Sequence, residues 1–209
     1  QHRLDGLKFK KGIFTNLSHD HLDYHKNYND YFNAKLYLFK NLLADKATII
    51  TDKDIPEYKS ILIISKKKKA SLKTISKQHG LIKVLEHKYI GEKQYLKIKY
   101  KNLKFSFYLN LIGKIQIKNL FMAILAAESR SLKIKKIVKI LSKIKPVNGR
   151  LEKIGKLKNK AICILDYAHT PEALELCLRN IKEQFVNKNI SIVLGCGGNR
   201  DYSKRSIIG

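Results

Sequence analysis

The sequence is poor in cysteine and in long hydrophobic runs. Its three cysteines, Cys163, Cys177 and Cys196, lie far apart and form no C-x-x-C pair. This excludes a disulfide framework and predicts reduced thiols in the core. No apolar run approaches the ~18 residues of a membrane span, and no basic start followed by an apolar segment indicates a signal peptide. We therefore expect a cytoplasmic protein that makes no membrane contact.

Acidic residues are also scarce, since 17 Asp and Glu face 43 Lys and Arg, for a net charge of +26. Such an excess is typical of proteins that neutralise nucleic-acid phosphates. Here, however, it is mostly lysine spread along the chain, and arginine, the usual residue for bidentate recognition, is rare. A lysine-covered surface is usually just solvated, so we predict no nucleic-acid partner. The lysine run 66–69 is expected to be a loop.

What is present is enough for a packed core, because 44% of the 209 residues are apolar. The length allows one or two domains. A stripe of apolar residues predicts an amphipathic helix from Tyr28 to Leu43. The other elements expected before Pro146 are strands at 11–17, 47–51, 60–65, 81–86, 95–100 and 103–109, and helices at 117–129 and 134–144.

Beyond Pro146 a new series of predicted strands and helices begins. Residues 161–165 and 190–194 are predicted to be buried strands, with a helix at 171–185 between them. Strand, helix and strand in this order are the start of a doubly wound parallel sheet. We therefore predict an α/β protein with one domain at 1–152 and the beginning of a second at 153–209. Because the chain opens on Gln1 and stops within this pattern, we expect it to be part of a longer protein.

A cluster of imidazoles and carboxylates follows the first predicted strand. It includes His19, Asp20, His21 and His25, which are plausible ligands for a divalent cation. His19 and Asp20 can also serve as caps of the next helix, so the pattern leaves both interpretations open. Lys35, fourteen residues after His21, would by itself be interpreted as a surface lysine.

Several motifs in consistent order resemble those of the Mur ligases, ATP-dependent amino-acid-adding enzymes of peptidoglycan synthesis. The string from Phe14 to His25 with Ala34-Lys35 resembles their central domain. The Asn-Gly-Arg-Leu-Glu motif at 148–152 resembles the hinge to their C-terminal domain. The motifs at 166–171 and 195–201 resemble signatures of the member that extends UDP-N-acetylmuramoyl-L-alanyl-D-glutamate. The resemblance implies an incomplete central ATPase-type domain followed by the start of a Rossmann-like C-terminal domain.

This resemblance implies a catalytic role for two residues. His21 and Lys35, the latter carbamylated, would hold Mg²⁺ between the ATP γ-phosphate and the substrate carboxylate. A carbamate supplies the anionic oxygens that a hard cation prefers, whereas an ammonium would repel it. The metal would offset charge as an acyl phosphate forms. An incoming amine would then displace phosphate to make the amide.

Further roles follow from the same resemblance. ATP would be bound by Arg150 at the phosphates, Asp166 at the ribose and hinge, His169 nearby and Asn119 near adenine. From the residues alone, Arg150 could also be a turn residue, Asp166 the end of a strand and His169 the start of a helix, although polar residues at the carboxyl end of a parallel strand favour a ligand site. The expected partners are a UDP-N-acetylmuramoyl-dipeptide and a free amino acid, with meso-diaminopimelate favoured, and the expected state is a monomer.

Three more residues would contact these substrates. Gln1 and Arg3 match positions at the UDP-sugar peptide, and Arg200 matches a position at the incoming amino acid, where a guanidinium suits a carboxylate.

The sequence also departs from the family pattern. No G-x-x-x-x-G-K-[ST] phosphate loop occurs in it, and the family places that loop upstream of Gln1. Ile115-Gln116 stands where Phe-Asn is usual. A non-catalytic remnant or a basic binding module that retains the scaffold is therefore the alternative hypothesis.

Overall fold

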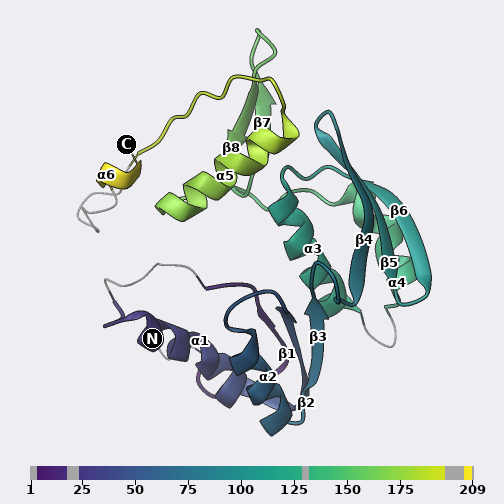
Figure 1. Ribbon diagram of the computed structural model, residues 1–209, viewed down its shortest axis with the longest axis vertical. Coiled ribbons are helices and arrows are strands. Elements are labelled where there is room, and N and C mark those ends of the chain that lie inside the picture. Colours follow the sequence, from purple (N-terminus) through teal and green to yellow (C-terminus); the bar gives the residue numbers. More distant parts are fainter. Residues whose placement is uncertain (1–3, 18–23, 129–131, 196–204, 209) are drawn as a thin grey trace. The chain divides into compact units, whose positions relative to one another are not determined.

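The first part of the chain folds as alternating strands and helices (Figure 1). The computed structural model describes residues 4–17, 24–128, 132–195 and 205–208. The elements up to residue 75 are β1 (Phe9–Phe14), α1 (Tyr28–Tyr37), a π-helical turn η1 (Leu38–Leu42), β2 (Leu43–Asp52), α2 (Tyr58–Lys67) and β3 (Ser71–Ile75). The three strands form a parallel sheet in the order β1-β2-β3. This confirms the predicted α/β class.

Strand β2 lies at the centre of this sheet, and its residues 49–52 are continuously buried, as expected of a central parallel strand. One apolar cluster joins Ile49 of β2 with Leu36 of α1, Phe39 of η1 and Ile61 of α2. Both helices therefore pack on the same face of the sheet. The predicted helical stripe is confirmed, although its last part is a π turn rather than α-helix.

Residues 60–65 are not the strand that the sequence predicts, because they lie within α2. A short run of isoleucine and leucine suits a buried strand and a buried helix equally well. The burial pattern has a helical period, since Ile61, Ile64 and Ser65 are buried and Ile63 is 54% exposed. The lysine run 66–69 is also not simply a loop, because its first two residues form the last turn of α2.

The next elements are β4 (Ile82–Ile90), β5 (Lys93–Tyr100), β6 (Leu103–Leu109), α3 (Lys114–Ala127), α4 (Ile134–Ile140), the 3-10 turn η2 (Leu141–Lys143), β7 (Glu152–Lys156), β8 (Ile162–Leu165), α5 (Pro171–Gln184) and α6 (Arg205–Ile208). Strands β4, β5 and β6 form a second sheet in that order. The expected strands and helices from 81 to 144 are thus confirmed, within a few residues at their ends. None of the described helices has the length and hydropathy needed to cross a membrane.

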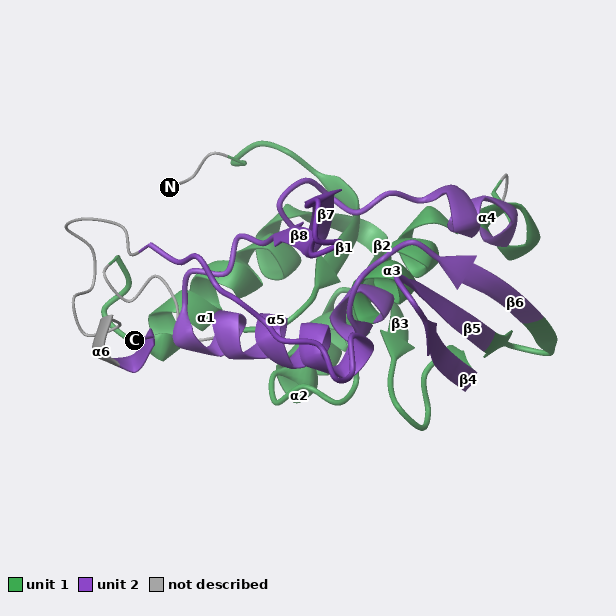
Figure 2. Ribbon diagram, turned by 90° about the horizontal axis from the view of Figure 1, so that it is seen from above, with its two compact units in different colours: residues 1–84, 98–104, 118–137 green, residues 85–97, 105–117, 138–209 purple. Residues whose placement is uncertain are grey.

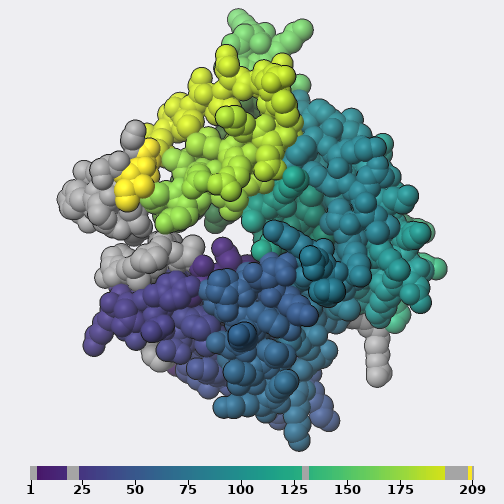
Figure 3. Space-filling model, in the orientation of Figure 1, coloured from purple at the N-terminus to yellow at the C-terminus, as the bar shows by residue number. Residues whose placement is uncertain are grey.

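Residues 190–194 are not a buried strand. No strand is assigned there, and Ile192 and Val193 are 51% and 102% exposed. Strand β8 pairs antiparallel with β7, which the sequence did not predict, and is only half-buried. A buried parallel strand needs neighbours along both edges, and among the described residues none pairs with 190–194. In Figure 3 this segment, coloured yellow-green, lies on the surface.

Residue contacts divide the chain into two compact units. One comprises residues 1–84, 98–104 and 118–137, and the other comprises 85–97, 105–117 and 138–209 (Figure 2). The boundary between the first domain and the second, predicted at 152–153, stays a prediction. Cys163 and Cys177 are free thiols of intermediate burial rather than core residues, and Cys196 lies outside the described residues. Burial, together with the charge of Asp166, raises the pKa of the Cys177 thiol to about 11.

Candidate functional site

Helix α1 carries Lys35 in its last turn. The helix begins after Asn27, whose side-chain oxygen accepts a hydrogen bond from the backbone N–H of Asp30 at 3.0 Å. The Tyr28 hydroxyl donates a bond of 2.7 Å to Oε1 of the buried Glu57. Burial, then this hydrogen bond and the charge of Glu57, raise the pKa of Tyr28 to about 12. The first turn of α1 is therefore fastened to the segment that begins α2.

The Lys35 side chain lies over an aromatic ring. Its Nζ is 4.9 Å from the centroid of the Tyr31 ring, and the His25 imidazole stacks on the same ring with centroids 5.1 Å apart. Cation–π attraction of this kind orients an ammonium. Lys35 forms no ion pair with a described residue. Converting this amine to a carbamate would break no salt bridge in the described part of the chain.

The proposed metal site rests on two residues, of which only Lys35 is described. His21 lies outside the described residues. Within the described ranges, no group of three His, Cys, Asp or Glu side chains could hold a metal ion by itself. An unmodified ammonium repels Mg²⁺, so Lys35 fits a metal site only as the carbamate, whose oxygens are of the hard type that Mg²⁺ binds.

A second set of predicted residues lies around the end of β8. Asp166 accepts two backbone hydrogen bonds of 2.8 Å, from Leu151 N–H to one carboxylate oxygen and from Ala168 N–H to the other. Leu151 has a φ of +46°, which a residue with a Cβ rarely adopts. Its bond to Asp166 and the burial of its side chain, 3% exposed, stabilise this turn. Asp166 thus joins the 149–151 turn to the 166–170 loop.

Arg150, Tyr167 and His169 form a polar, exposed cluster on this frame. The Arg150 guanidinium lies over the Tyr167 ring, 5.1 Å from its centroid. The centroids of the His169 and Tyr167 rings are 5.4 Å apart, and Nδ1 of His169 lies 3.0 Å from the Tyr167 carbonyl oxygen. Arg150 is exposed and has no carboxylate partner among the described residues. An oriented, unpaired guanidinium fits a polyphosphate ligand.

Helix α3 contributes to the same region through Gln116. Its Nε2 donates a hydrogen bond of 2.9 Å to the backbone oxygen of Arg150. This is the glutamine that stands where the family usually has asparagine. Asn119 lies three residues further along α3, and because of this spacing it shares a helix face with Gln116. Its side chain is exposed. The structure therefore brings Arg150, Asp166 and His169 together and places Asn119 on the helix that contacts Arg150.

Three predicted substrate-binding residues, Gln1, Arg3 and Arg200, lie outside the described residues, as does His21. Two contacting aromatics were missed from the sequence, Tyr31 and Tyr167. Tyr31 could have been found by its spacing, because residues i and i+4 share a helix face and Lys35 follows it by four. Tyr167 lies inside the 166–171 motif, but nothing in the sequence indicates that Arg150 packs on it.

Comparison with known proteins identifies the family in which these motifs occur. Residues 1–127 match the family model of the Mur ligase middle domain, and residues 149–209 match that of the Mur ligase glutamate ligase domain. The chain is 34% identical over 211 residues to the UDP-N-acetylmuramoyl-L-alanyl-D-glutamate–2,6-diaminopimelate ligase of Agrobacterium fabrum. It is 35% identical over 210 residues to the ligase of the same name from Rickettsia bellii. All of this chain is covered, but only 42% and 43% of those relatives.

Solved structures agree with the sequence matches. A structure of a UDP-N-acetylmuramoyl-L-alanyl-D-glutamate–2,6-diaminopimelate ligase aligns with a TM-score of 0.72 at 26% identity, over 99% of this chain and 42% of the other. MurF from Acinetobacter baumannii aligns with the same TM-score at 16% identity, over 84% of this chain and 38% of the other. The second likeness concerns the fold alone.

Proposed function

Since this chain belongs to the Mur ligase family, we propose that the protein containing it adds the third amino acid to UDP-N-acetylmuramoyl-L-alanyl-D-glutamate. ATP is the energy source, and meso-diaminopimelate is the favoured amino acid. The chain spans about two fifths of the length of its relatives, so the proposal concerns the whole cytoplasmic enzyme. The observation that supports this function best is the pair of hydrogen bonds by which Asp166 joins the turn that holds Arg150 to the loop that holds His169.

In the proposed reaction, an oxygen of the substrate carboxylate forms a bond to the γ-phosphorus of ATP, and ADP leaves. The amino group then attacks the acyl carbon of the resulting acyl phosphate, loses a proton and displaces inorganic phosphate. Positioning of phosphates supplies most of the catalysis in such transfers. Arg150, held over Tyr167, is suited to orient them, while Asp166 fixes the turn from which Arg150 extends.

Magnesium would supply positive charge against the phosphates. We propose that His21 and carbamylated Lys35 hold it. Asn119 and His169 are assigned to the nucleotide, and Gln1, Arg3 and Arg200 to the UDP-sugar peptide and the amino acid. These assignments rest on the family motifs.

The decisive experiment measures phosphate release by the complete enzyme with ATP, UDP-N-acetylmuramoyl-dipeptide and meso-diaminopimelate. Lys35→Ala should lose more than about 100-fold in kcat while the protein stays folded. Lys59→Ala, an exposed lysine of α2, is the matched control and should keep its activity. Activity of Lys35→Ala within about tenfold of wild type, ~1.4 kcal/mol, would show that Lys35 is an ordinary surface residue. A ¹³C-bicarbonate NMR signal present in wild type and absent in Lys35→Ala would report the carbamate independently of turnover.

A paired substitution separates the two binding roles. Arg→Lys keeps the charge but removes the planar fork, so Arg150→Lys should raise the KM for ATP and Arg200→Lys the KM for the amino acid. The reverse pattern would exchange the assignments. A complete protein that is folded but turns over no ATP with any of the substrates would instead support the non-catalytic alternative.

A further inference from the structure

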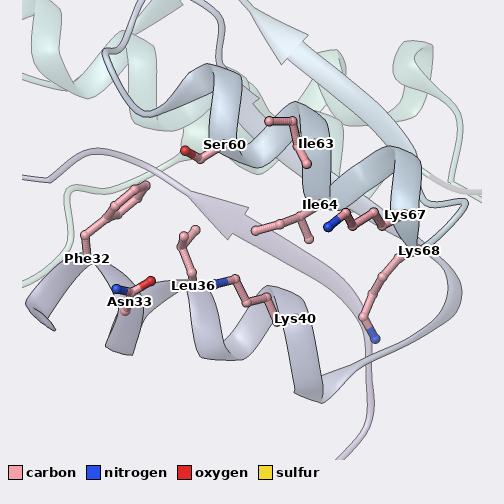
Figure 4. A pocket seen from close by; sticks show the side chains of 9 residues that line it. All are labelled: Phe32, Asn33, Leu36, Lys40, Ser60, Ile63, Ile64, Lys67 and Lys68. Atoms are coloured by element: carbon pink, nitrogen blue, oxygen red, sulfur yellow. The ribbon is translucent and has the colours of Figure 1, made fainter. Parts of the chain in front are cut away.

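A pocket of about 510 Å³ lies on one side of the parallel sheet, between α1 with its continuation η1 and helix α2 (Figure 4). Its size is that of a small-molecule site. Apolar side chains from both helices line it, with Leu36 and Ile64 buried and Phe32 and Ile63 more accessible. The accessible apolar surface of the pocket therefore comes mainly from Phe32 and Ile63.

Three lysines line the same pocket, Lys40 from η1, Lys67 from the end of α2 and Lys68 next to it. Figure 4 shows the nitrogens of Lys40 and Lys67 turned toward the space between the two helices, while Lys68 extends away along the chain. Lys68 Nζ donates to the Leu43 carbonyl oxygen at 3.1 Å, which leaves two of its three donors. Two of these side chains, Lys40 and Lys67, therefore face the concave apolar surface, and Lys68 lies at its edge.

Among the described residues that line this pocket, none is acidic. None of the three lysines forms an ion pair with a residue in the described part of the chain, whereas other lysines, such as Lys73 and Lys118, do have carboxylate partners. Gathering like charges without a counter-ion is unfavourable, and a bound anion would relieve it. Charge and apolar surface together select the occupant. An anion without an apolar part would leave the apolar lining in contact with water, and a neutral molecule would leave the ammonium groups without a counter-ion.

We propose that this pocket binds a small amphiphilic anion, a molecule with a single carboxylate or other acidic group on an apolar body. The apolar body packs on Phe32 and Ile63, and the acidic group lies between Lys40 and Lys67. The site is separate from Lys35, because residues 32, 36 and 40 follow one face of the helical segment and Tyr31 and Lys35 follow another. It is therefore independent of the proposed ligase activity.

Calorimetric titration of the protein with decanoate tests the proposal. Decanoate should bind saturably with a Kd below about 1 mM, while neutral 1-decanol and acetate, which lacks the long apolar chain, should each bind at least tenfold more weakly. Equal affinity for 1-decanol would show an apolar groove without charge selection. Equal affinity for acetate would show unspecific attraction to lysine, and absence of decanoate binding at 5 mM would refute the site.

Two charge-matched double variants locate the binding. Lys40→Glu with Lys67→Glu should raise the decanoate Kd at least tenfold. Lys59→Glu with Lys66→Glu changes the net charge equally but alters exposed residues that do not line the pocket, and should stay within twofold of wild type. Equal weakening by both pairs would mean that the overall charge of +26 attracts the anion. Circular dichroism checks that each variant is folded, and the methyl NMR signals of Ile63 and Ile64 should shift in wild type before those of the exposed Ile154.

Discussion

Two short apolar runs of similar composition differ in burial in this chain. Thr48-Ile49-Ile50 lies in β2, where both isoleucines are fully buried, whereas Ser191-Ile192-Val193 forms no strand and is exposed. Strand β2 has β1 and β3 along its two edges and two helices over one face. Among the described residues, 190–194 has no paired neighbour. Burial of an apolar run is thus decided by the partners that surround it, and not by its composition.

The largest effect expected from this comparison concerns Ile49. Ile49→Ala should lower the free energy of unfolding by about 2–5 kcal/mol, because it removes buried methyl groups and leaves a cavity in a packed cluster. Val193→Ala, at a fully exposed position, should change it by less than about 0.5 kcal/mol. Urea denaturation of both variants measures the difference. A comparable loss at Val193 would mean that the exposed run is packed in solution.

A second test compares a shielded charged group with an exposed one. Glu128 accepts hydrogen bonds from the Tyr100 hydroxyl at 2.6 Å and from Lys73 Nζ at 3.1 Å, and its side chain is 17% exposed. Glu128→Gln should cost about 1–3 kcal/mol. Glu175 pairs with Arg179 on α5, with side chains 68% and 63% exposed, and Glu175→Gln should cost less than about 0.5 kcal/mol. Equal costs, measured by urea denaturation, would contradict the distinction.

The contribution of Glu128 should depend on pH. Burial raises the pKa of this carboxyl, but the bonds from Tyr100 and Lys73 outweigh burial and hold it below the ordinary value of 4.5. The folded protein therefore favours the ionised form, so the contribution is complete above the unfolded pKa and is lost as pH falls through the lower, folded one. The stability gap between wild type and Glu128→Gln should shrink below about pH 4.5. A gap that widened on acidification would mean that folding raises the pKa of Glu128 instead of lowering it.

The smallest expected difference lies in a turn of the second unit. Gly113 has φ +82°, and an added Cβ would lie 2.9 Å from Cβ and Oδ1 of Asn180 on α5. Gly91 has φ +59°, with nothing within 4 Å of an added Cβ. Both Gly→Ala variants incur the left-handed cost of about 1–2 kcal/mol, and Gly113→Ala should lose about 1 kcal/mol more through the close contact. Equal melting temperatures would show that Asn180 moves aside freely.

Local pattern predicted most of the fold, and it failed where non-local partners decide. Strand β5 alternates between buried and half-buried residues, which sequence reasoning detects directly. Strand β7 contains one large apolar residue, Ile154, and exists because β8 pairs with it. At the site, the resemblance to the family assigned Arg150, Asp166 and His169 to one nucleotide, which implies that they are neighbours. Their contacts with Tyr167 and Leu151 depend on side-chain positions that spacing does not encode.

The bond between Asp166 and Leu151 has a consequence for local opening of the chain. The unfavourable φ of Leu151 is held in part by a carboxylate fifteen residues further along, at the end of the β7–β8 hairpin. The turn and the hairpin should therefore open as one cooperative unit, with the amide protons of Leu151 and Ala168 exchanging together with those of β8. Each opening event would release the Arg150 side chain from its ordered position at the same moment.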